Sequence, residues 1–599
     1  MQENWHILSP DPEQVSMLAE SLGCQPAFAT VLINRGICSK DQAVAFLKPS
    51  LAHVRSPFLM KDVDRAVERI LVAIRRGEKV LIFGDYDTDG ITATAILFEF
   101  LAYLDADVDY YIPNRLTEGY GLTRDYVEKR AIPDGIGLII TVDCGISSFD
   151  GVSAGRRAGI DVIITDHHET PPLIPEAFAV LNPKQPDCTS GFSWLAGVGV
   201  ALNLVMALRK RLRDEGFWSA RGAPEPNLKA ACDLVALGTV ADMVPLVQEN
   251  RIYVKAGLEV LASDVRPGVK ALLDVCNMLN RPLDTRDLAF KLAPRVNAAG
   301  RLSHGSTALK LLMTSNMETA HAIAKQLNQE NTRRQKIENR ILSEIVQHLE
   351  NNPELLEQRA LVLDREGWHR GVIGIVASRL VDRYYRPVVL IAVADGIGKG
   401  SARTPDGFDL YEGLKGCARY LEKFGGHKAA AGITLKAEHI PAFRRDFERI
   451  VCQETTPEDF VPKLVIDGEI SASDVCAELA DELEALAPFG TGNPEPLFFL
   501  SDMDVLSARV VGGNHFQMRL RPSNSPKADQ TRPFDAILFN AGADNPPPKR
   551  FQRIACHVRW NRWPPARRGL HAGGRDRKSI QLVIKDFLAA RSDRIVENI

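Results

Sequence analysis

Short runs of β-branched and aromatic residues alternate with longer segments of helical periodicity in the first third of the chain. The runs at 80–83, 108–112, 137–142 and 161–165 predict strands, and the segments at 62–75, 91–104 and 148–158 predict helices. Strands that alternate with helices at this spacing form βαβ units and therefore a parallel sheet. In such a sheet, ligands bind outside the carboxyl ends of the strands.

A long helical pattern separates this predicted sheet from a second α/β unit. Apolar residues recur from 318 to 349 at spacings of mostly four. The middle of this segment, 328–336, is polar all round, which is typical of a helix that bridges two domains through solvent. A strand near 360, a helix at 371–384 and a strand at 388–393 follow.

From about residue 461 the pattern changes to short apolar runs separated by Gly, Pro and Asn. These runs lie at 464–466, 497–500, 508–511, 516–520, 536–539 and 580–584. They predict a small all-β domain, and an OB-like barrel fits its length.

The patterns together predict an α/β protein with several domains, as expected for 599 residues. We expect an N-terminal helical lead at 1–55, a domain with a parallel sheet at 56–315, a connecting helix at 316–350, a second, smaller α/β domain at 351–457 and an OB-like domain at 458–590.

Composition narrows the class of protein without pointing to a partner. The chain is 45% hydrophobic and 25% charged, with a net charge of -3, so any basic surface must be local. Ten scattered cysteines without a CxxC pair indicate neither a zinc site nor a disulfide framework. The N-terminus has no signal-peptide pattern, and no apolar run reaches the length of about 18 residues of a membrane helix. We therefore expect a cytoplasmic protein that does not associate with membranes.

The first candidate site follows the predicted strand at 80–83. Asp85, Asp87 and Asp89 stand at alternate positions, and such a density of carboxylates suits a hard cation such as Mg2+ or Mn2+. An EF-hand loop would need a Glu at its twelfth position, which is Ile96 here, and a helix in front. From this stretch alone, a solvated acidic turn remains an alternative.

Further acids and histidines follow other predicted strands. Asp143 follows 137–142, and Asp166, His167 and His168 follow 161–165. Asp242 lies in an otherwise apolar segment, where a buried acid is costly unless it is paired or bound to a metal, although it could instead cap a helix.

Oxygen ligands with one or two imidazoles favour Mn2+ or Mg2+ over a zinc site built from thiolates. Two ions roughly 3.5–4 Å apart would bind a phosphodiester and activate water, and Asp143 is the best candidate to bridge them. By contrast, Gly197-Val-Gly199 lacks the third glycine and the preceding strand of a dinucleotide-binding loop.

Several basic residues could bind phosphate. Arg115 lies on a Gly-rich loop, and Arg301 lies among small residues. Two expected turns, at 398–403 with its Ser and Arg and at 424–432 with its His, could each cradle a phosphate backbone. Between 549 and 578, ten Lys or Arg stand against one acid, with Phe551, Trp560 and Trp563 interleaved. This combination is typical of a single-strand binder, but a basic loop beside tryptophans of a barrel core is the alternative.

Four motifs in this order resemble the DHH phosphoesterase superfamily: DYDTDG (85–90), VDCG (142–145), DHH (166–168) and GTVADMVP (238–245). LAPRVNAAGR (292–301), FGGHKAAAG (424–432) and the basic β-domain make the chain similar to the RecJ single-stranded-DNA exonucleases, from about 33 to 584. The resemblance implies DHH, DHHA1 and OB domains in that order. The insertion PPARRGLHAGG (564–574) looks longer and more basic than is usual in this family, which leaves the edge of the barrel open.

The resemblance implies a 5′-to-3′ exonuclease that degrades single-stranded DNA to 5′-mononucleotides with two metal ions, in recombination and repair. It implies Asp87, Asp89, Asp143, His167 and Asp242 as metal ligands; His168, Asp166 and Asp85 as catalytic residues; and Arg115, Arg301, Ser401, Arg403 and His427 as substrate-binding residues. A single-strand-binding protein and a helicase are further candidate partners.

Two rival functions remain at this point. A DHH-type phosphodiesterase could act on short oligonucleotides or dinucleotides, although a tiny substrate needs no basic β-domain. A non-catalytic DNA-binding scaffold is the other, although unneutralised carboxylates would repel DNA.

Overall fold

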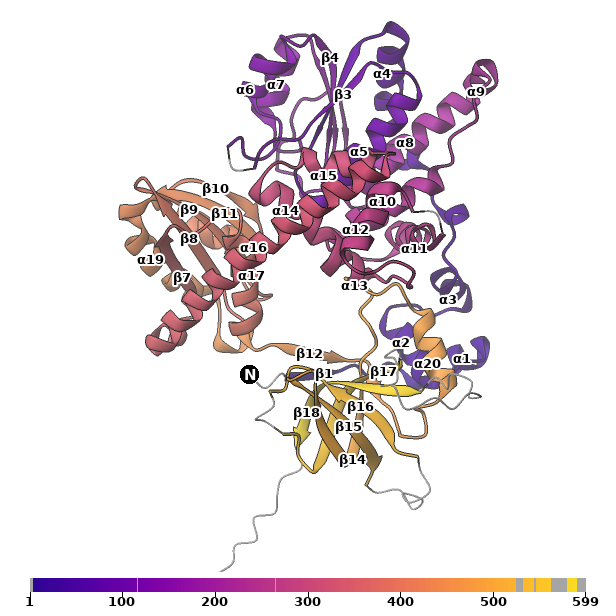
Figure 1. Cartoon of the computed structure of the whole chain (residues 1–599), viewed down its shortest axis with the longest axis vertical. Coiled ribbons are helices and arrows are strands. Elements are labelled where there is room, and N and C mark those ends of the chain that lie inside the picture. Colours follow the sequence, from indigo (N-terminus) through magenta and orange to yellow (C-terminus); the bar gives the residue numbers. More distant parts are fainter. Residues whose placement is uncertain are drawn as a thin grey trace, which may run out of the picture. The chain divides into compact units, whose positions relative to one another are not determined.

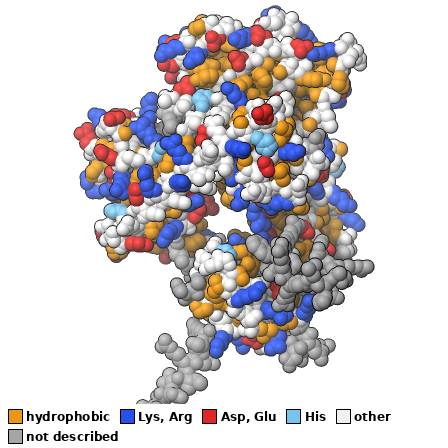
Figure 2. All heavy atoms as spheres, in the orientation of Figure 1, with side chains coloured by type: hydrophobic (Ala, Val, Ile, Leu, Met, Phe, Trp, Pro, Cys, Tyr) orange, Lys and Arg blue, Asp and Glu red, His pale blue; other side chains and the backbone are white. Residues whose placement is uncertain are grey.

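The computed structural model describes residues 4–115, 117–263, 265–523, 532–542, 546–561 and 579–589 (Figure 1). The chain divides into two compact units, one made of 50–461 with 490–492, and the other of 1–49, 462–489 and 493–599. Charged side chains of both signs are interspersed on the face in Figure 2, in keeping with 73 Lys and Arg against 76 Asp and Glu. Among the described residues, no helix combines the length and apolar character that a membrane span requires.

A five-stranded parallel sheet begins the larger unit, as the sequence predicts. It contains β2 (Lys79–Gly84), β3 (Val108–Tyr111), β4 (Ile136–Val142), β5 (Asp161–Thr165) and β6 (Ala179–Leu181), in the order β3-β2-β4-β5-β6. Gly84 pairs with Val142, and Val142 pairs with Thr165. This register brings the carboxyl ends of β2, β4 and β5 to one edge of the sheet.

Helices cover both faces of this sheet (Figure 1). One face packs on α4 (Val63–Arg76), α5 (Thr88–Tyr103) and α8 (Gly197–Asp214), and the other on α6 (Arg124–Tyr126) and α7 (Phe149–Arg157). Ile82 and Ile140 face the first layer, whereas Leu81 and Ile139 face the second. Because both faces are buried, the strands are almost continuously apolar.

Helices complete this domain on the α5 and α8 side. They are α9 (Phe217–Arg221), α10 (Cys232–Ala241), α11 (Gln248–Ser263), α12 (Pro267–Val275), α13 (Thr285–Asp287), α14 (Ala293–Leu302) and α15 (Ser306–Met313). Helix α10 packs against both α5 and α8, and this packing brings its carboxyl end, next to Asp242, close to the carboxyl ends of the strands.

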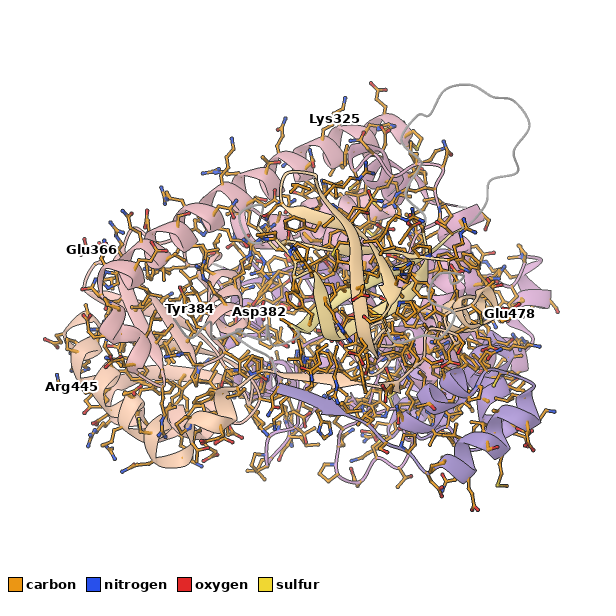
Figure 3. All side chains as sticks on the ribbon, turned by 90° about the horizontal axis from the view of Figure 1, so that it is seen from below. Lys325, Glu366, Asp382, Tyr384, Arg445 and Glu478 are labelled. Atoms are coloured by element: carbon orange, nitrogen blue, oxygen red, sulfur yellow. The ribbon has the colours of Figure 1, made fainter. Side chains whose placement is uncertain are left out.

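The long helix α16 (Met317–Asn351) confirms the predicted connecting element. Lys325 on its outer side points away from the protein in Figure 3. The expectation that its polar middle crosses solvent is wrong for one face, because Asn331, Arg334 and Glu338 are buried there. Arg334 pairs with Glu338 at 2.9 Å, so the polar pattern reflects a buried network of charged and polar side chains.

The second α/β domain has a mixed five-stranded sheet of order β10-β11-β9-β8-β7. Its elements are β7 (Leu361–Glu366), α17 (Ile373–Tyr384), β8 (Val388–Ala394), β9 (Ile397–Arg403), α18 (Leu410–Gly416), β10 (Leu421–His427), β11 (Ala430–Lys436) and α19 (Ile440–Glu454). The turn expected at 398–403 is wrong, because this segment lies in β9. The segment at 424–432 does contain a turn, but it is only the two residues 428–429 between β10 and β11, and the rest lies in strands. Glycines occur there because a Cβ on Gly400 would lie 2.6 Å from Ile433 of the neighbouring strand.

The smaller unit contains a six-stranded sheet of order β13-β14-β15-β16-β18-β17, which β14 and β17 close into a barrel. Its strands are β13 (Gly468–Glu469), β14 (Phe498–Val511), β15 (His515–Pro522), β16 (Phe534–Leu538), β17 (Arg550–Trp560) and β18 (Ile580–Ala589). The runs at 497–500 and 508–511 belong mainly to one long strand, β14, instead of two. The barrel confirms the predicted OB-like fold.

The N-terminal segment packs in this same unit. It forms β1 (Asn4–Ile7), α1 (Pro12–Leu22), α2 (Pro26–Asn34) and α3 (Lys40–Leu47), with β1 parallel to β12 (Lys463–Ile466). Leu32 and Phe498 share one core, together with α20 (Ala477–Ala485). The first part of the basic stretch is β17, in which Trp560 donates to Asp481 at 2.8 Å. Trp563 and the insertion at 564–574 lie outside the described residues.

Candidate active site

The turn from β2 into α5 places the first acids. Asp87 is the N-cap of α5, and its Oδ1 accepts from the backbone N–H groups of Asp89 at 2.9 Å and Gly90 at 3.1 Å. Such a cap satisfies donors that the first turn of a helix leaves free. A Cβ on Gly90 would lie 2.8 Å from the Cα of Asp85, so glycine allows the turn to close tightly. The acidic string therefore folds as a helix cap that gathers three carboxylates.

Asp89 is buried against the start of α8. Its Oδ2 accepts from the N–H of Gly197 at 2.7 Å, and its Oδ1 accepts from the N–H of Val198 at 2.9 Å. A Cβ on Gly197 would lie 2.5 Å from Oδ1 of Asp143. The segment 197–199 does not fit a dinucleotide loop. Its first glycine instead allows the N-terminus of α8 to lie against Asp89 and Asp143. Sequence reasoning missed this role of Gly197.

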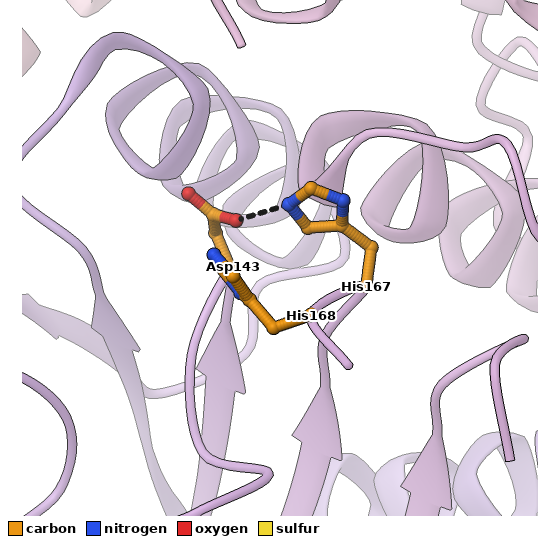
Figure 4. Close-up of side chains that lie close together, drawn as sticks. All are labelled: Asp143, His167 and His168. Carbon is orange, nitrogen blue, oxygen red and sulfur yellow. Dashed lines mark ion pairs between the residues drawn. The ribbon is translucent and has the colours of Figure 1, made fainter. Parts of the chain in front are cut away.

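Asp143 and His167 lie at the centre of the site (Figure 4). Asp143 follows β4 with a left-handed φ of 60°, and its Oδ1 is 3.1 Å from Nε2 of His167. The same imidazole nitrogen is 3.5 Å from Oδ2 of Asp242 and 3.7 Å from Oδ2 of Asp89. One imidazole therefore joins acids that lie up to 153 residues apart in sequence (242 minus 89).

Burial makes this arrangement costly without a cation. Burial, followed by the charges of Asp89, Asp87 and Asp242, raises the pKa of Asp143 well above its usual value. Burial, followed by the charge of His168, lowers the pKa of His167 to about 3, so its ring is neutral. A neutral imidazole is the form that binds a metal.

Several polar atoms here have no hydrogen-bond partner among the described residues. They are Oδ1 of Asp85, Oδ1 of Asp143 and both ring nitrogens of His167; the 3.1 Å approach of Asp143 to His167 lacks hydrogen-bond geometry. A buried polar group without a partner costs about 1–3 kcal/mol. Carboxylate oxygens and an imidazole without partners fit a Mg2+ or Mn2+ ion, which would satisfy them.

The potential ligand atoms form overlapping sets. Within each set they lie within 4.8 Å of one another: Asp85, Asp87 and Asp143; Asp89, His167 and Asp242; Asp143, His167 and His168. Asp143 occurs in two of the sets, as a bridging carboxylate would. The residues thus fit two ions better than one.

Asp166 has a different position from the other acids. Its Oδ1 accepts from Nδ1 of His168 at 2.7 Å and from two backbone N–H groups, and its Oδ2 accepts from the N–H of Ile146 at 2.9 Å. Burial alone would raise the pKa of Asp166, but the hydrogen bond from His168 lowers it to about 2. Its contacts orient His168 and do not face the other acids.

Two polar residues at this edge were not predicted. The hydroxyl of Tyr120 donates to the backbone oxygen of Asp143 at 3.1 Å and lies 3.3 Å from Nδ1 of His168. Oδ1 of Asn297 accepts from the N–H of Thr88 at 2.8 Å and so holds the start of α5. The available signals were a Tyr between two glycines and the Asn of LAPRVNAAGR, a motif examined for its arginines.

The predicted arginines gather on one side of the acids. Arg115 lies 5.1 Å above the ring of Tyr86, which stands between two of the acids. NH1 of Arg403 donates to Oγ of Ser401 at 3.2 Å, and NH1 of Arg301 donates to the backbone oxygen of Gly371 at 3.4 Å.

These guanidinium groups have no carboxylate in ion-pair contact within the described part of the chain. Burial, followed by the charge of Arg115, lowers the pKa of Arg301 to about 9. Burial, followed by Arg115, also lowers the pKa of Arg403, to about 10. Clustered cations of this kind fit a phosphate.

His427 ends β10 in the second α/β domain, and its Nδ1 accepts from the N–H of Ala429 at 3.4 Å. Burial lowers the pKa of His427, and the nearby charges of Arg403 and His168 lower it further. The structure therefore brings all the predicted site residues to one region of the larger unit, from both of its α/β domains.

The edge of the parallel sheet carries carboxylates and imidazoles that suit divalent cations, and a cluster of arginines lies beside it. Together these features define a metal-dependent phosphoesterase. Family models match at 79–239 (DHH family, N-terminal domain), 357–453 (DHHA1 domain) and 466–586 (RecJ OB domain). The chain is 38% identical to the single-stranded-DNA-specific exonuclease RecJ of Bacillus subtilis over 589 residues, which cover 97% of this chain and 70% of the relative. It is also 38% identical to RecJ of Escherichia coli, over 86% of this chain and 89% of that one. The chain belongs to the RecJ family.

Solved structures agree with this assignment. RecJ of Thermus thermophilus in complex with Mn2+ matches with a TM-score of 0.80 and 30% identity, over 98% of this chain and 80% of that chain. The Mg2+ complex of the same protein matches with a TM-score of 0.74 and 29% identity, over 98% and 79%. The family resemblance and the fold class expected from the sequence are confirmed.

Proposed function

We propose that this protein is a single-stranded-DNA-specific exonuclease that hydrolyses phosphodiester bonds with Mn2+ or Mg2+. The observation that carries this function is the set of buried acids and the neutral His167 in a RecJ-family fold, with polar atoms that have no hydrogen-bond partner among the described residues. Beside them lie arginines that have no carboxylate partner in the described part of the chain. A non-catalytic scaffold would not need such a set, because buried carboxylates without a cation repel each other and DNA.

In this proposal five residues hold the two ions: Asp87, Asp89, Asp143, His167 and Asp242. When bound, the ions activate a water molecule and offset the charge on the leaving oxygen. Asp85 supports Asp143 from the neighbouring strand end. His168, held at Nδ1 by Asp166, keeps Nε2 for a hydrogen bond to an oxygen of the scissile phosphate.

In this proposal Arg115, Ser401 and Arg403 bind the terminal phosphate, and Arg301 lies on the path by which the strand reaches the metals. His427 approaches the same phosphates from the second domain. Because a terminal phosphate anchors the strand end, one mononucleotide is released at a time, and the resemblance assigns the 5′ end, hence 5′-mononucleotides and the 5′-to-3′ direction. Polarity and a role in recombination and repair rest on the family resemblance, as do partners such as a helicase and a single-strand-binding protein. The cytoplasmic location and the five-part division at 1–55, 56–315, 316–350, 351–457 and 458–590 rest on the sequence patterns.

The test is digestion of 5′- and 3′-labelled single strands and matched duplexes with Mn2+, with Mg2+ and with chelator. We expect mononucleotides only from single strands with a metal, and loss of activity in Asp143→Asn. Asp125→Asn, which changes an exposed acid paired with Lys129, is the control and should cleave normally. Hydrolysis that survives the chelator or Asp143→Asn would refute the metal assignment. A strong preference for dinucleotides would favour a small-substrate phosphodiesterase.

A further inference from the structure

The sheet order places a cation on each side of the metal-binding edge. Strands β3 and β6 are the two outer strands, and each is two positions from the central strand β4. With strands about 4.8 Å apart, each lies about 10 Å from the strand that carries Asp143. Arg115 follows β3, and Lys184 follows β6 on the opposite side. The site described above gives Arg115 a role and leaves Lys184 without one.

A buried side chain fixes the backbone of Lys184 relative to the DHH motif. Nδ2 of Asn182, which is fully buried, donates to the backbone oxygen of His168 at 2.9 Å. Its Oδ1 accepts from the N–H of Lys184, also at 2.9 Å. Gln185 is buried too, and its Nε2 donates to the backbone oxygen of Val180 at 2.7 Å. The loop after β6 is thus built to hold Lys184 in place beside His168.

Among the described residues, the ammonium group of Lys184 has only a weak partner. Its Nζ lies 3.0 Å from Oε1 of Glu169, but that side chain is 74% exposed, whereas Lys184 is 27% exposed. An exposed carboxylate holds a cation weakly, so a phosphate can replace it. 

The charge of Lys184 also acts on residues of both α/β domains. Burial is the main reason that the pKa values of His167 and His427 are low, and Lys184 lowers both further. It partly offsets the effect of burial, which raises the pKa of Asp242. These effects agree with the position beside the DHH motif in which the hydrogen bonds of Asn182 hold the backbone of Lys184.

We infer that Lys184 binds the phosphate that follows the scissile one, on the side of the metals opposite Arg115. This inference rests on the proposed function, because a terminal phosphate at Arg115 and a scissile phosphate at the metals determine where the next phosphate falls. A strand then crosses the carboxyl edge of the sheet from β3 to β6. The ligand is the second phosphodiester of a 5′-phosphorylated single strand.

The test compares three 5′-phosphorylated substrates with Mn2+: a dinucleotide with one phosphodiester, a trinucleotide with two, and a trinucleotide whose second linkage is a neutral methylphosphonate. Lys184→Gln should lower kcat/KM for the ordinary trinucleotide about tenfold, mainly by raising KM, because one charge-assisted hydrogen bond is lost. The variant should match wild type within twofold on the other two substrates. Lys184→Arg should retain most of the activity.

Lys61→Gln is the matched control. Nζ of Lys61 contacts the same loop, at 3.3 Å from Oε1 of Gln185, and pairs with Asp187 at 2.7 Å. Its kcat/KM values should equal those of wild type on all three substrates.

Each outcome decides between the two proposals. If Lys184→Gln loses activity equally on all substrates, or on none, the inference about Lys184 is overturned while the proposed function stands. If wild type hydrolyses neither these substrates nor the labelled single strands, the proposed function fails and the inference fails with it; if it cleaves only the labelled single strands, the inference alone is overturned, because the second phosphate then does not suffice for binding. Loss confined to the trinucleotide with two charged linkages supports both.

Discussion

Glu338 is a fully buried carboxylate on the connecting helix, and its removal should loosen the junction between the two α/β domains. Its Oε2 lies 2.9 Å from NH1 of Arg334 on the same helix, and its Oε1 lies 2.6 Å from Nε of Arg379 on α17. Arg334 also donates to Oδ1 of Asn331 at 2.9 Å. The carboxylate therefore joins α16 to α17, the helix that packs against β9 with its predicted phosphate-binding residues.

The expected magnitude follows from the burial of each partner. Glu338→Ala leaves the guanidinium of Arg334, which is 10% exposed, without a charged partner in the described part of the chain, and breaking such a buried pair costs about 3–5 kcal/mol. The side chain of Arg379 is 47% exposed, so loss of that pair adds at most about 1 kcal/mol. Glu338→Gln keeps an acceptor in place and should cost less than Glu338→Ala.

The loosened junction should also lower the rate of hydrolysis. A Cβ on Gly374 of α17 would lie 2.9 Å from Oγ of Ser401, so α17 and the strand with Ser401 and Arg403 are in close contact. A displacement of about 1 Å between reacting groups can cost about 100-fold in rate. We expect kcat/KM on 5′-phosphorylated single strands to fall at least tenfold in Glu338→Ala.

Hydrogen exchange across 328–345 measures the local stability, and steady-state hydrolysis measures the activity. Glu344→Ala is the matched control on the same helix, because Glu344 also contacts several partners, Arg340, Arg365 and Trp368, but its side chain is 31% exposed. It should lower stability by no more than about 1 kcal/mol. If Glu338→Ala exchanges and cleaves like Glu344→Ala, the reasoning about the junction is wrong.

Two further predictions concern other parts of the protein. Gly197→Ala should weaken Mn2+ binding and activity without unfolding the domain, because the new Cβ would stand 2.5 Å from Oδ1 of Asp143; Mn2+ affinity equal to wild type, by isothermal titration, would contradict this. His557 in β17 is buried, with Nδ1 donating to the backbone oxygen of Pro496 at 2.7 Å, and burial lowers its pKa from 6.5 to about 4. A lowered imidazole pKa gives stability that is full above about pH 6.5 and is lost as pH falls toward 4, about 3 kcal/mol in all. Denaturant unfolding of His557→Gln should lack this pH dependence, and an equal dependence in both proteins would refute the assignment.

Local patterns predicted the parts of the fold that depend on residues close in sequence. The strands that became β2, β4 and β5 were predicted within about a residue, because each is a short apolar run between turn residues. Where patterns failed, neighbouring strands decided the structure. The glycines of 398–403 favour a turn by themselves, but hydrogen bonds to β8 and β11 hold them in a strand. Likewise, β1 pairs with β12, more than 450 residues away, and no local pattern contains that pairing.

The sequence by itself determined the chemistry available to this protein: acids and histidines directly after successive parallel strands, where sheet geometry brings strand ends together. Only the tertiary structure decided what each of them does. In the folded protein Asp166 contacts the ring of His168, Gly197 lies against Asp89 and Asp143, and Glu338 is buried between two arginines. The physical reason is that a side chain's charge state and role depend on its burial and partners, and those partners come from segments far apart in the chain.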